Sequence, residues 1–268
     1  MITDQRKKQL SELAYFIAQE FTTNKVVQLE DIANSEEIAF HFDHYEDYFD
    51  GMLLYDDSLF HIHLNIDRGN FQKSKRGQFT FAHELSHYFI NEHRIGLKSG
   101  QLEPHPSKHE INQKSVIEYE ADYFASCLLM PESLFKSEAG GRMKKFSLDT
   151  IINLSNTFQT SILATVLKFA QTAPHDITAV ISKNNVVKWY AQTSDFPKWA
   201  FKFKVGTALP SSTVAGEFFT KKDAKYTGIE DVDPDDWFYS KWQPKTQMHE
   251  QCYYSESYGY VISLIWFD

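Results

Sequence analysis

Residues 83–87 have the sequence His-Glu-Leu-Ser-His, and this short stretch constrains the chain more than any other part of it. Successive residues of an α-helix turn by about 100°, so two histidines four positions apart lie on one face. Two such imidazoles can bind one zinc ion, with the neighbouring glutamate beside the metal's water as a general base. His83 and His87 are therefore predicted metal ligands, and Glu84 is the predicted base.

A catalytic zinc site needs a third protein ligand and keeps one position open for water. His93 falls where the last histidine stands in the pattern H-E-x-x-H-x-x-G-x-x-H, but Ile90 takes the place of the glycine at which the chain leaves the helix. An unbroken helix would carry His93 about two turns beyond His87 and away from the ligand face. We therefore expect His93 not to bind the metal.

Glu118 and Asp122 offer a second solution, because they lie four residues apart on a helix predicted over about 115–130. The glutamate would bind the metal, and the aspartate would accept a hydrogen bond from the distal nitrogen of a ligand histidine. Residues 115–118 also fit a capping box, in which Glu118 would only close the first helical turn. Glu120 is expected to point away from the metal. We favour Glu118 as the third ligand.

The composition excludes several other kinds of protein. A net charge of −9 argues against a general binder of nucleic acid or anionic membranes. Two cysteines, Cys127 and Cys252, are too few for a disulfide framework. No run of about 18 apolar residues is present to span a membrane, and the polar N-terminus does not resemble an export signal. We expect a cytoplasmic protein.

The hydrophobic patterns predict both helices and strands. Helical spacing appears over residues 9–21, 78–91 and 115–130, and two short helices are expected between 144 and 171. Strands are expected over 51–55 and 58–66, and residues 94–114 are expected to form a long loop. Beyond Pro174 the pattern is β-rich, with a hairpin at Asn184-Asn185 and a closing strand over 258–267. These patterns predict an α+β protein.

At these motifs the chain resembles the ImmA/IrrE family of metallopeptidases. The resemblance is carried by residues 60–65, 77–87, 118–125 and 128–131. It implies a gluzincin-like site in which His83, His87 and Glu118 bind Zn²⁺. In such a site Glu84 acts as the base, and Asp122 orients a ligand histidine.

The resemblance also implies a domain organisation and a function. We expect a zincin-like metallopeptidase domain over 1–143, a helix-turn-helix-like segment over 144–173 and a β-rich α+β domain, a possible sensor, over 174–268. Members of the family are linked to the cleavage of helix-turn-helix repressors in mobile elements or stress responses. The implied function is therefore that of a zinc-dependent endopeptidase whose protein substrate is such a repressor.

Two other functions remain open. One is a regulatory protein that binds a repressor or DNA without cutting, using the basic residues Lys144, Lys145 and Lys168. Because Lys168 is the one basic residue in the second short helix, we expect this segment to pack and not to bind DNA. The other is a zinc hydrolase that acts on non-peptide substrates, since the same ligands serve several hydrolyses.

Substrate binding leads to further expectations. The strand over 60–66 is a candidate edge for an extended substrate, although an ordinary sheet strand fits the pattern equally well. The donor that stabilises the oxyanion is left open among Tyr88, His93 and Tyr123. Surface positions are expected for the three histidines that follow the motif: His93, His105 and His109. In the C-terminal region, four tryptophans either line a small-molecule pocket or belong to the core: Trp189, Trp199, Trp237 and Trp242.

Overall fold

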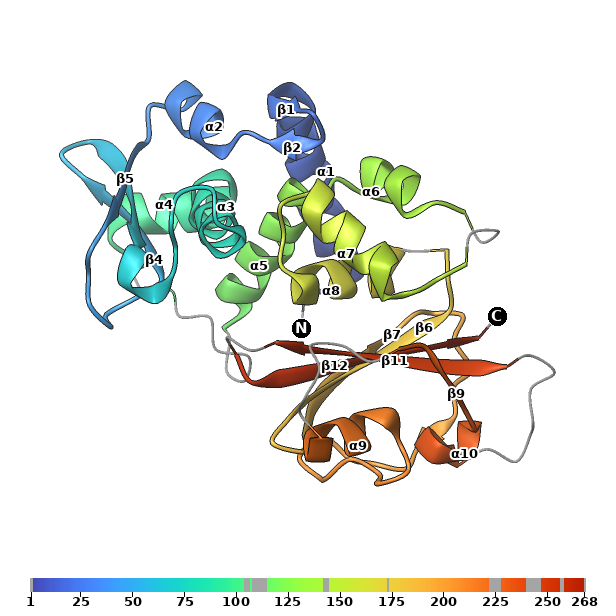
Figure 1. Ribbon diagram of the computed structural model, residues 1–268. Coiled ribbons are helices and arrows are strands. Elements are labelled where there is room, and N and C mark those ends of the chain that lie inside the picture. The colour runs from blue at the N-terminus through green and yellow to red at the C-terminus, as the bar shows by residue number, and fades with distance from the viewer. Residues whose placement is uncertain are drawn as a thin grey trace. The chain divides into compact units, whose positions relative to one another are not determined.

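The computed structural model describes residues 2–103, 107, 115–141, 145–172, 174–221, 228–239, 247–255 and 258–267. These residues form a mixed α+β fold with ten α-helices and four β-sheets, which confirms the predicted fold class (Figure 1). The chain divides into two compact units. Unit 1 contains Met1–Phe135 and Ser155–Ser161, and unit 2 contains Lys136–Leu154 and Ile162–Asp268. The three-part division at residues 143 and 173 stays a prediction.

The first unit contains most of the helices. Its elements are α1 (Asp4–Phe21), β1 (Thr22–Thr23), β2 (Val26–Val27), α2 (Leu29–Ser35), β3 (Ala39–Asp43), β4 (Gly51–Asp56), β5 (Leu59–Asn65), the 3-10 helix η1 (Ile66–Arg68), α3 (Lys75–Phe89), α4 (Asn91–Ser99) and α5 (Val116–Leu129). Two helices contribute residues to both units: α6 (Glu132–Ala139) and α7 (Leu148–Thr157).

The sheet beside the His-Glu motif has the strand order β3-β5-β4. In β5, the buried residues Ile62 and Leu64 alternate with half-buried histidines, as expected for a strand with one face in the core. The prediction that this strand forms an edge is wrong, because β5 pairs with β3 on one side and with β4 on the other. Alternation shows which face of a strand is buried, but not whether its edges are paired.

Helix α3 packs between this sheet and α5 (Figure 1). The Phe81 ring lies 5.2 Å from that of Phe40 on β3, and the Phe89 ring lies 6.3 Å from that of Phe124 on α5. Ser74 caps the helix, since its side chain accepts a hydrogen bond from the Gly77 N–H at 2.9 Å. The motif therefore lies on a helix that is held on two sides.

Helix α3 ends at Phe89, earlier than expected, and the predicted loop from residue 94 is wrong because α4 occupies Asn91–Ser99. The two helices meet at Ile90, whose φ of −74° and ψ of 107° are extended. This conformation is open to any residue, so the chain leaves the helix without a glycine. The assumption of an unbroken helix, on which the placement of His93 rested, is therefore wrong.

The second unit is built around a five-stranded sheet of order β7-β6-β12-β11-β9, in which all pairs are antiparallel. Its elements are α8 (Ile162–Thr172), β6 (Ile177–Lys183), β7 (Val186–Gln192), β8 (Ala200–Phe201), α9 (Val214–Lys221), β9 (Glu230–Val232), α10 (Pro234–Trp237), β10 (Phe238–Tyr239), β11 (Met248–Ser255) and β12 (Tyr260–Phe267). The predicted hairpin is present, with positive φ at both Asn184 and Asn185, and β12 is the predicted closing strand.

The tryptophans of this unit differ in their surroundings. Trp237 is completely buried in the core of unit 2. Trp199 packs against that core and also lines a hollow of about 490 Å³ together with Tyr190, Phe201 and Phe203. Trp242 lies outside the described residues. That the hollow binds a small molecule stays a prediction.

The two short helices predicted after residue 144 are α7 and α8, joined by a turn in which Gln159 has a φ of 52°. Lys168 of α8 is only 2% exposed, so its side chain cannot reach a DNA backbone from this position. Lys144 lies outside the described residues. None of the helices in the described part of the chain is both long and apolar enough to cross a membrane.

Candidate metal centre

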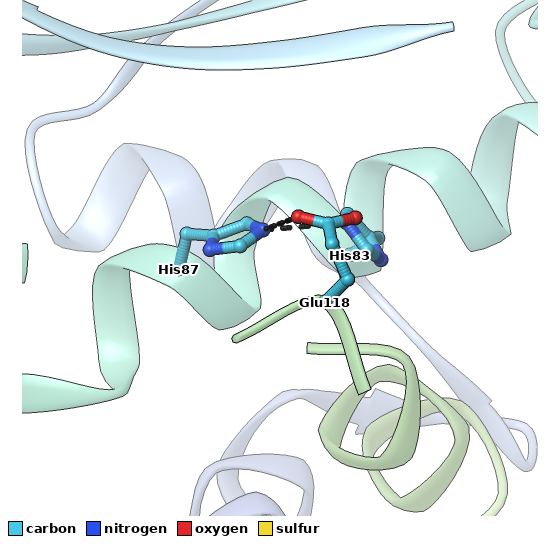
Figure 2. A group of neighbouring side chains, drawn as sticks. All are labelled: His83, His87 and Glu118. Carbon is cyan, nitrogen blue, oxygen red and sulfur yellow. Dashed lines mark hydrogen bonds and ion pairs between the residues drawn. The ribbon is translucent and has the colours of Figure 1, made fainter. Parts of the chain in front are cut away.

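The structure brings His83, His87 and Glu118 together between α3 and α5 (Figure 2). The two histidine Nε2 atoms lie 3.3 Å apart. The Glu118 carboxylate reaches both of them, with Oε2 at 3.3 Å from His83 Nε2 and Oε1 at 3.5 Å from His87 Nε2. Both histidines are buried, whereas the Glu118 side chain is 15% exposed. The three predicted ligands therefore point their donor atoms at one place.

These distances fit a metal ion of zinc's size. A tetrahedral zinc ion with nitrogen ligands about 2.0–2.1 Å away would hold two such nitrogens about 3.3–3.4 Å apart, close to the separation in this cluster. One donor atom from each of the three residues lies within 4.8 Å of the others. Among the described residues, no second cluster of three such side chains is found. Two imidazoles and one carboxylate, with no thiolate, are donors typical of a catalytic zinc site.

Asp122 fixes the orientation of His83. Asp122 lies on α5, one turn after Glu118. One of its carboxylate oxygens lies 2.9 Å from His83 Nδ1. An ionised carboxylate only accepts hydrogen bonds, so Nδ1 carries a hydrogen, and Nε2, which faces Glu118, is the nitrogen available to a metal ion. Burial acts to lower the pKa of His83, but the Asp122 and Glu118 carboxylates outweigh it and raise the pKa. For His87, whose Nδ1 atom faces His93, burial dominates and lowers the pKa.

Glu84 is buried beside the ligands, under the first residue of β4. A Cβ atom on Gly51 would lie 2.6 Å from Glu84 Oε1 and 2.6 Å from Thr80 Cγ2, so a larger residue would require these side chains or β4 to shift. The preceding residue, Asp50, is fully buried and is held by Arg76 at 2.6 Å and Arg68 at 3.1 Å. Gly51 is not among the residues predicted from the sequence, although a glycine at the start of a strand can indicate a close backbone approach.

His93 is buried, so its expected surface position is wrong. Its Nδ1 atom lies 3.2 Å from Nδ1 of His87, on the side of the ring away from Glu118, and its Nε2 atom lies 3.4 Å from Glu120 Oε2. His93 is thus behind a predicted ligand and not among the three clustered donors. The other two histidines of this region, His105 and His109, lie outside the described residues.

The three candidate oxyanion donors have other neighbours. The Tyr88 hydroxyl donates to Glu36 at 2.9 Å, and His93 stands behind His87. Burial raises the pKa of Tyr123, and the polar groups that act on it include Cys127, Glu132 and Ser11. The oxyanion donor stays unassigned among these three.

The described residues thus combine an α+β fold with a cluster of three donors that could hold a metal ion. Residues 68–169 match the family model Peptidase_M78, described as an IrrE N-terminal-like domain. This stretch runs from the residues before α3 through α5 to α8 and contains all the predicted site residues. The resemblance to the ImmA/IrrE family seen in the sequence is therefore confirmed over residues 68–169.

Among solved structures, a Mycobacterium tuberculosis transcriptional regulator is similar to the chain, with a TM-score of 0.59. The alignment covers 98% of this chain and 78% of that one, at 13% sequence identity. At this identity the similarity shows the fold alone. Among curated proteins, none is significantly similar in sequence.

Proposed function

We propose that the protein is a zinc-dependent endopeptidase that cleaves a helix-turn-helix transcriptional repressor and so induces genes of a stress response or mobile element. The observation that carries the proposal is the convergence of His83, His87 and Glu118 next to the buried carboxylate of Glu84. A metal held there, with a base beside it, is what peptide hydrolysis requires. A repressor substrate implies that the enzyme acts in the cytoplasm.

The residues of the chain would divide the work as follows. Bound Zn²⁺ would supply Lewis-acid chemistry, which lowers the pKa of water and polarises a carbonyl group. Glu84 takes the proton from the attacking water and later delivers it to the leaving amine nitrogen. Asp122 holds His83 with Nε2 directed at the metal position, 3.3 Å from Glu118 Oε2. The burial of Glu84 keeps its carboxylate away from bulk water.

The peptide substrate is proposed to add as a strand beside β4. This strand is at an edge of the β3-β5-β4 sheet, and its first residue lies against Glu84. Gly51 already pairs with Ser107 in an antiparallel bridge, so a substrate strand would add along the part of β4 that follows Gly51. A photo-crosslinker at the exposed Asp56 of β4 should capture substrate in the Glu84→Gln variant. The same group at the exposed Asp43 of β3 is the matched control, and capture there alone would favour the other edge.

The choice of a repressor as substrate follows from the family of residues 68–169. A non-cleaving, DNA-binding regulator is a weaker account, because the basic residue of α8 is buried. A hydrolase of non-peptide substrates is also less favoured, because the matched family is one of peptidases.

Co-incubation with a small helix-turn-helix repressor encoded beside this gene tests the proposal. The protein with Zn²⁺ should cut the repressor at one site that mass spectrometry can map, and removal of zinc by a chelator should stop the cleavage. Binding of the intact repressor without cleavage, in the presence of stoichiometric zinc, would instead support the non-cleaving regulator.

A further inference from the structure

The two predicted histidine ligands differ in what lies behind them. Nδ1 of His83 meets the carboxylate of Asp122 at 2.9 Å, and this contact by itself decides which nitrogen carries the hydrogen. Nδ1 of His87 meets an imidazole nitrogen instead, that of His93 at 3.2 Å. An imidazole nitrogen either donates or accepts, so this contact alone leaves the tautomer of His87 open.

The far side of His93 resolves the ambiguity. Its Nε2 atom faces Glu120 Oε2 at 3.4 Å. Arg6 donates to both oxygens of Glu120, from Nε at 2.9 Å and from Nη2 at 2.6 Å. A guanidinium only donates hydrogen bonds, so both oxygens of Glu120 act as acceptors. These contacts form a series that runs from Arg6 on α1 through Glu120 on α5 and His93 on α4 to His87.

These contacts determine which ring nitrogens of His93 and His87 carry a hydrogen. Facing an acceptor, Nε2 of a neutral His93 carries the ring hydrogen, and its Nδ1 accepts. Nδ1 of His87 must therefore donate, which leaves the lone pair on Nε2, the nitrogen 3.5 Å from Glu118 Oε1. The reverse arrangement would put a hydrogen on His87 Nε2, where the metal has to bind. A side chain of the same shape as His93 but without nitrogens would not determine the tautomer of His87.

We propose that His93, held by Glu120 and Arg6, is a positioning residue that fixes the tautomer and ring orientation of His87 for metal binding. This inference rests on the proposed function, because it assumes that His87 binds zinc. It gives His87 the support that Asp122 gives His83, through a longer path. Partners of this kind are typically worth about 10–100-fold in metal affinity.

Two variants of His93 separate this role from simple packing. His93→Phe keeps an aromatic ring between His87 and Glu120 but removes both nitrogens. His93→Asn leaves a smaller side chain but offers an amide oxygen close to the position of Nδ1. If His93 fixes the tautomer, Phe should weaken zinc binding by about 10–100-fold and Asn should recover part of the loss. If His93 only fills space, the order should reverse, because Asn leaves a cavity.

Glu92→Gln is the matched control. Arg6 forms an ion pair with Glu92 at 3.1 Å as well as with Glu120. Glu92→Gln weakens this exposed ion pair but leaves the contacts from Arg6 through Glu120 and His93 to His87 in place. Its zinc affinity should stay within about twofold of the unmodified protein, in keeping with the small value of exposed ion pairs.

The measurement is zinc affinity by competition with a chromophoric chelator, together with the visible spectrum of the Co²⁺-substituted protein. The expected result is weaker binding and an altered Co²⁺ spectrum in His93→Phe, both partly restored in His93→Asn. Unchanged affinity and spectrum in His93→Phe would overturn this inference and leave the proposed function standing. Failure of the unmodified protein to bind zinc would overturn the proposed function itself.

Discussion

The carboxylate of Asp122 lies 2.9 Å from Nδ1 of His83, on the side of the ring opposite the nitrogen that faces Glu118. Asp122→Ala should therefore leave the tautomer of His83 unfixed. Zinc affinity is expected to fall by about 10–100-fold, with little change in the circular dichroism of the protein. Chelator competition measures the affinity, and equal zinc binding by the variant would contradict the role given to Asp122.

Glu118 is proposed to bind the metal, but it also begins a helix. Its backbone N–H donates to the Ser115 side chain at 3.3 Å, which is one half of a capping box. Glu118→Ala should abolish stoichiometric zinc binding. Ser115→Ala should cost about 1 kcal/mol of helix stability and leave zinc binding intact. Equal zinc binding in the two variants would favour the capping interpretation of Glu118.

Gly51 leaves no room for a side chain over the carboxylate of Glu84, the proposed base. In Gly51→Ala the new methyl group would meet Glu84 Oε1 and Thr80 Cγ2, each at 2.6 Å, and either the carboxylate or β4 must move. Turnover should drop by at least about tenfold while zinc affinity changes little, because a small misplacement of a reacting group is costly. Gly141→Ala is the control, since no heavy atom lies within 4 Å of its added Cβ. Equal turnover in both variants would refute the close-approach argument.

Glu250 gives unit 2 a pH-dependent stability. Its carboxylate is fully buried and accepts hydrogen bonds from the N–H groups of Val214 at 3.0 Å and Ala215 at 2.9 Å and from the Trp237 indole at 2.8 Å. Burial nevertheless raises its pKa above the ordinary value of 4.5. The folded protein then holds the proton more tightly than the unfolded chain. This contribution to stability is complete below pH 4.5 and is lost as the pH rises through the raised pKa.

Glu250→Gln removes this titration. The variant should be less stable at low pH by about 1–3 kcal/mol, because an amide cannot accept all of these hydrogen bonds. The difference from the unmodified protein should shrink as the pH rises above 4.5. Urea unfolding followed by tryptophan fluorescence measures it, since all five tryptophans lie at residue 189 or later. Asp195→Asn, at an exposed position outside this strand pair, is the control. A difference that does not change with pH would contradict the expected titration.

The parts of the site that depend on one helix at a time could be predicted from the sequence. The four-residue spacing of His83 and His87, and that of Glu118 and Asp122, determines which side chains share a face wherever the helices lie. The structure brings the two faces together. Their catalytic and metal-binding roles stay proposals.

The remaining features depend on contacts between elements distant in sequence. His93 contacts His87 because the helix ends at Ile90. Since φ of Ile90 is negative, this break needs no glycine and leaves no signal in the sequence. Arg6 joins His93 through Glu120, 114 residues away, so no local pattern contains the pair. The central position of β5 and the close approach of Gly51 to Glu84 likewise follow from the packing of the sheet on α3.

The Glu84→Gln variant tests the central claim most directly, with zinc content and repressor cleavage measured on the same sample. The account predicts one bound zinc per chain and no detectable cleavage, because the amide keeps the shape of the side chain but cannot take a proton. Glu20→Gln, at an exposed position on α1, should keep both properties. Cleavage by the zinc-loaded Glu84→Gln variant at the rate of the unmodified protein would contradict the account.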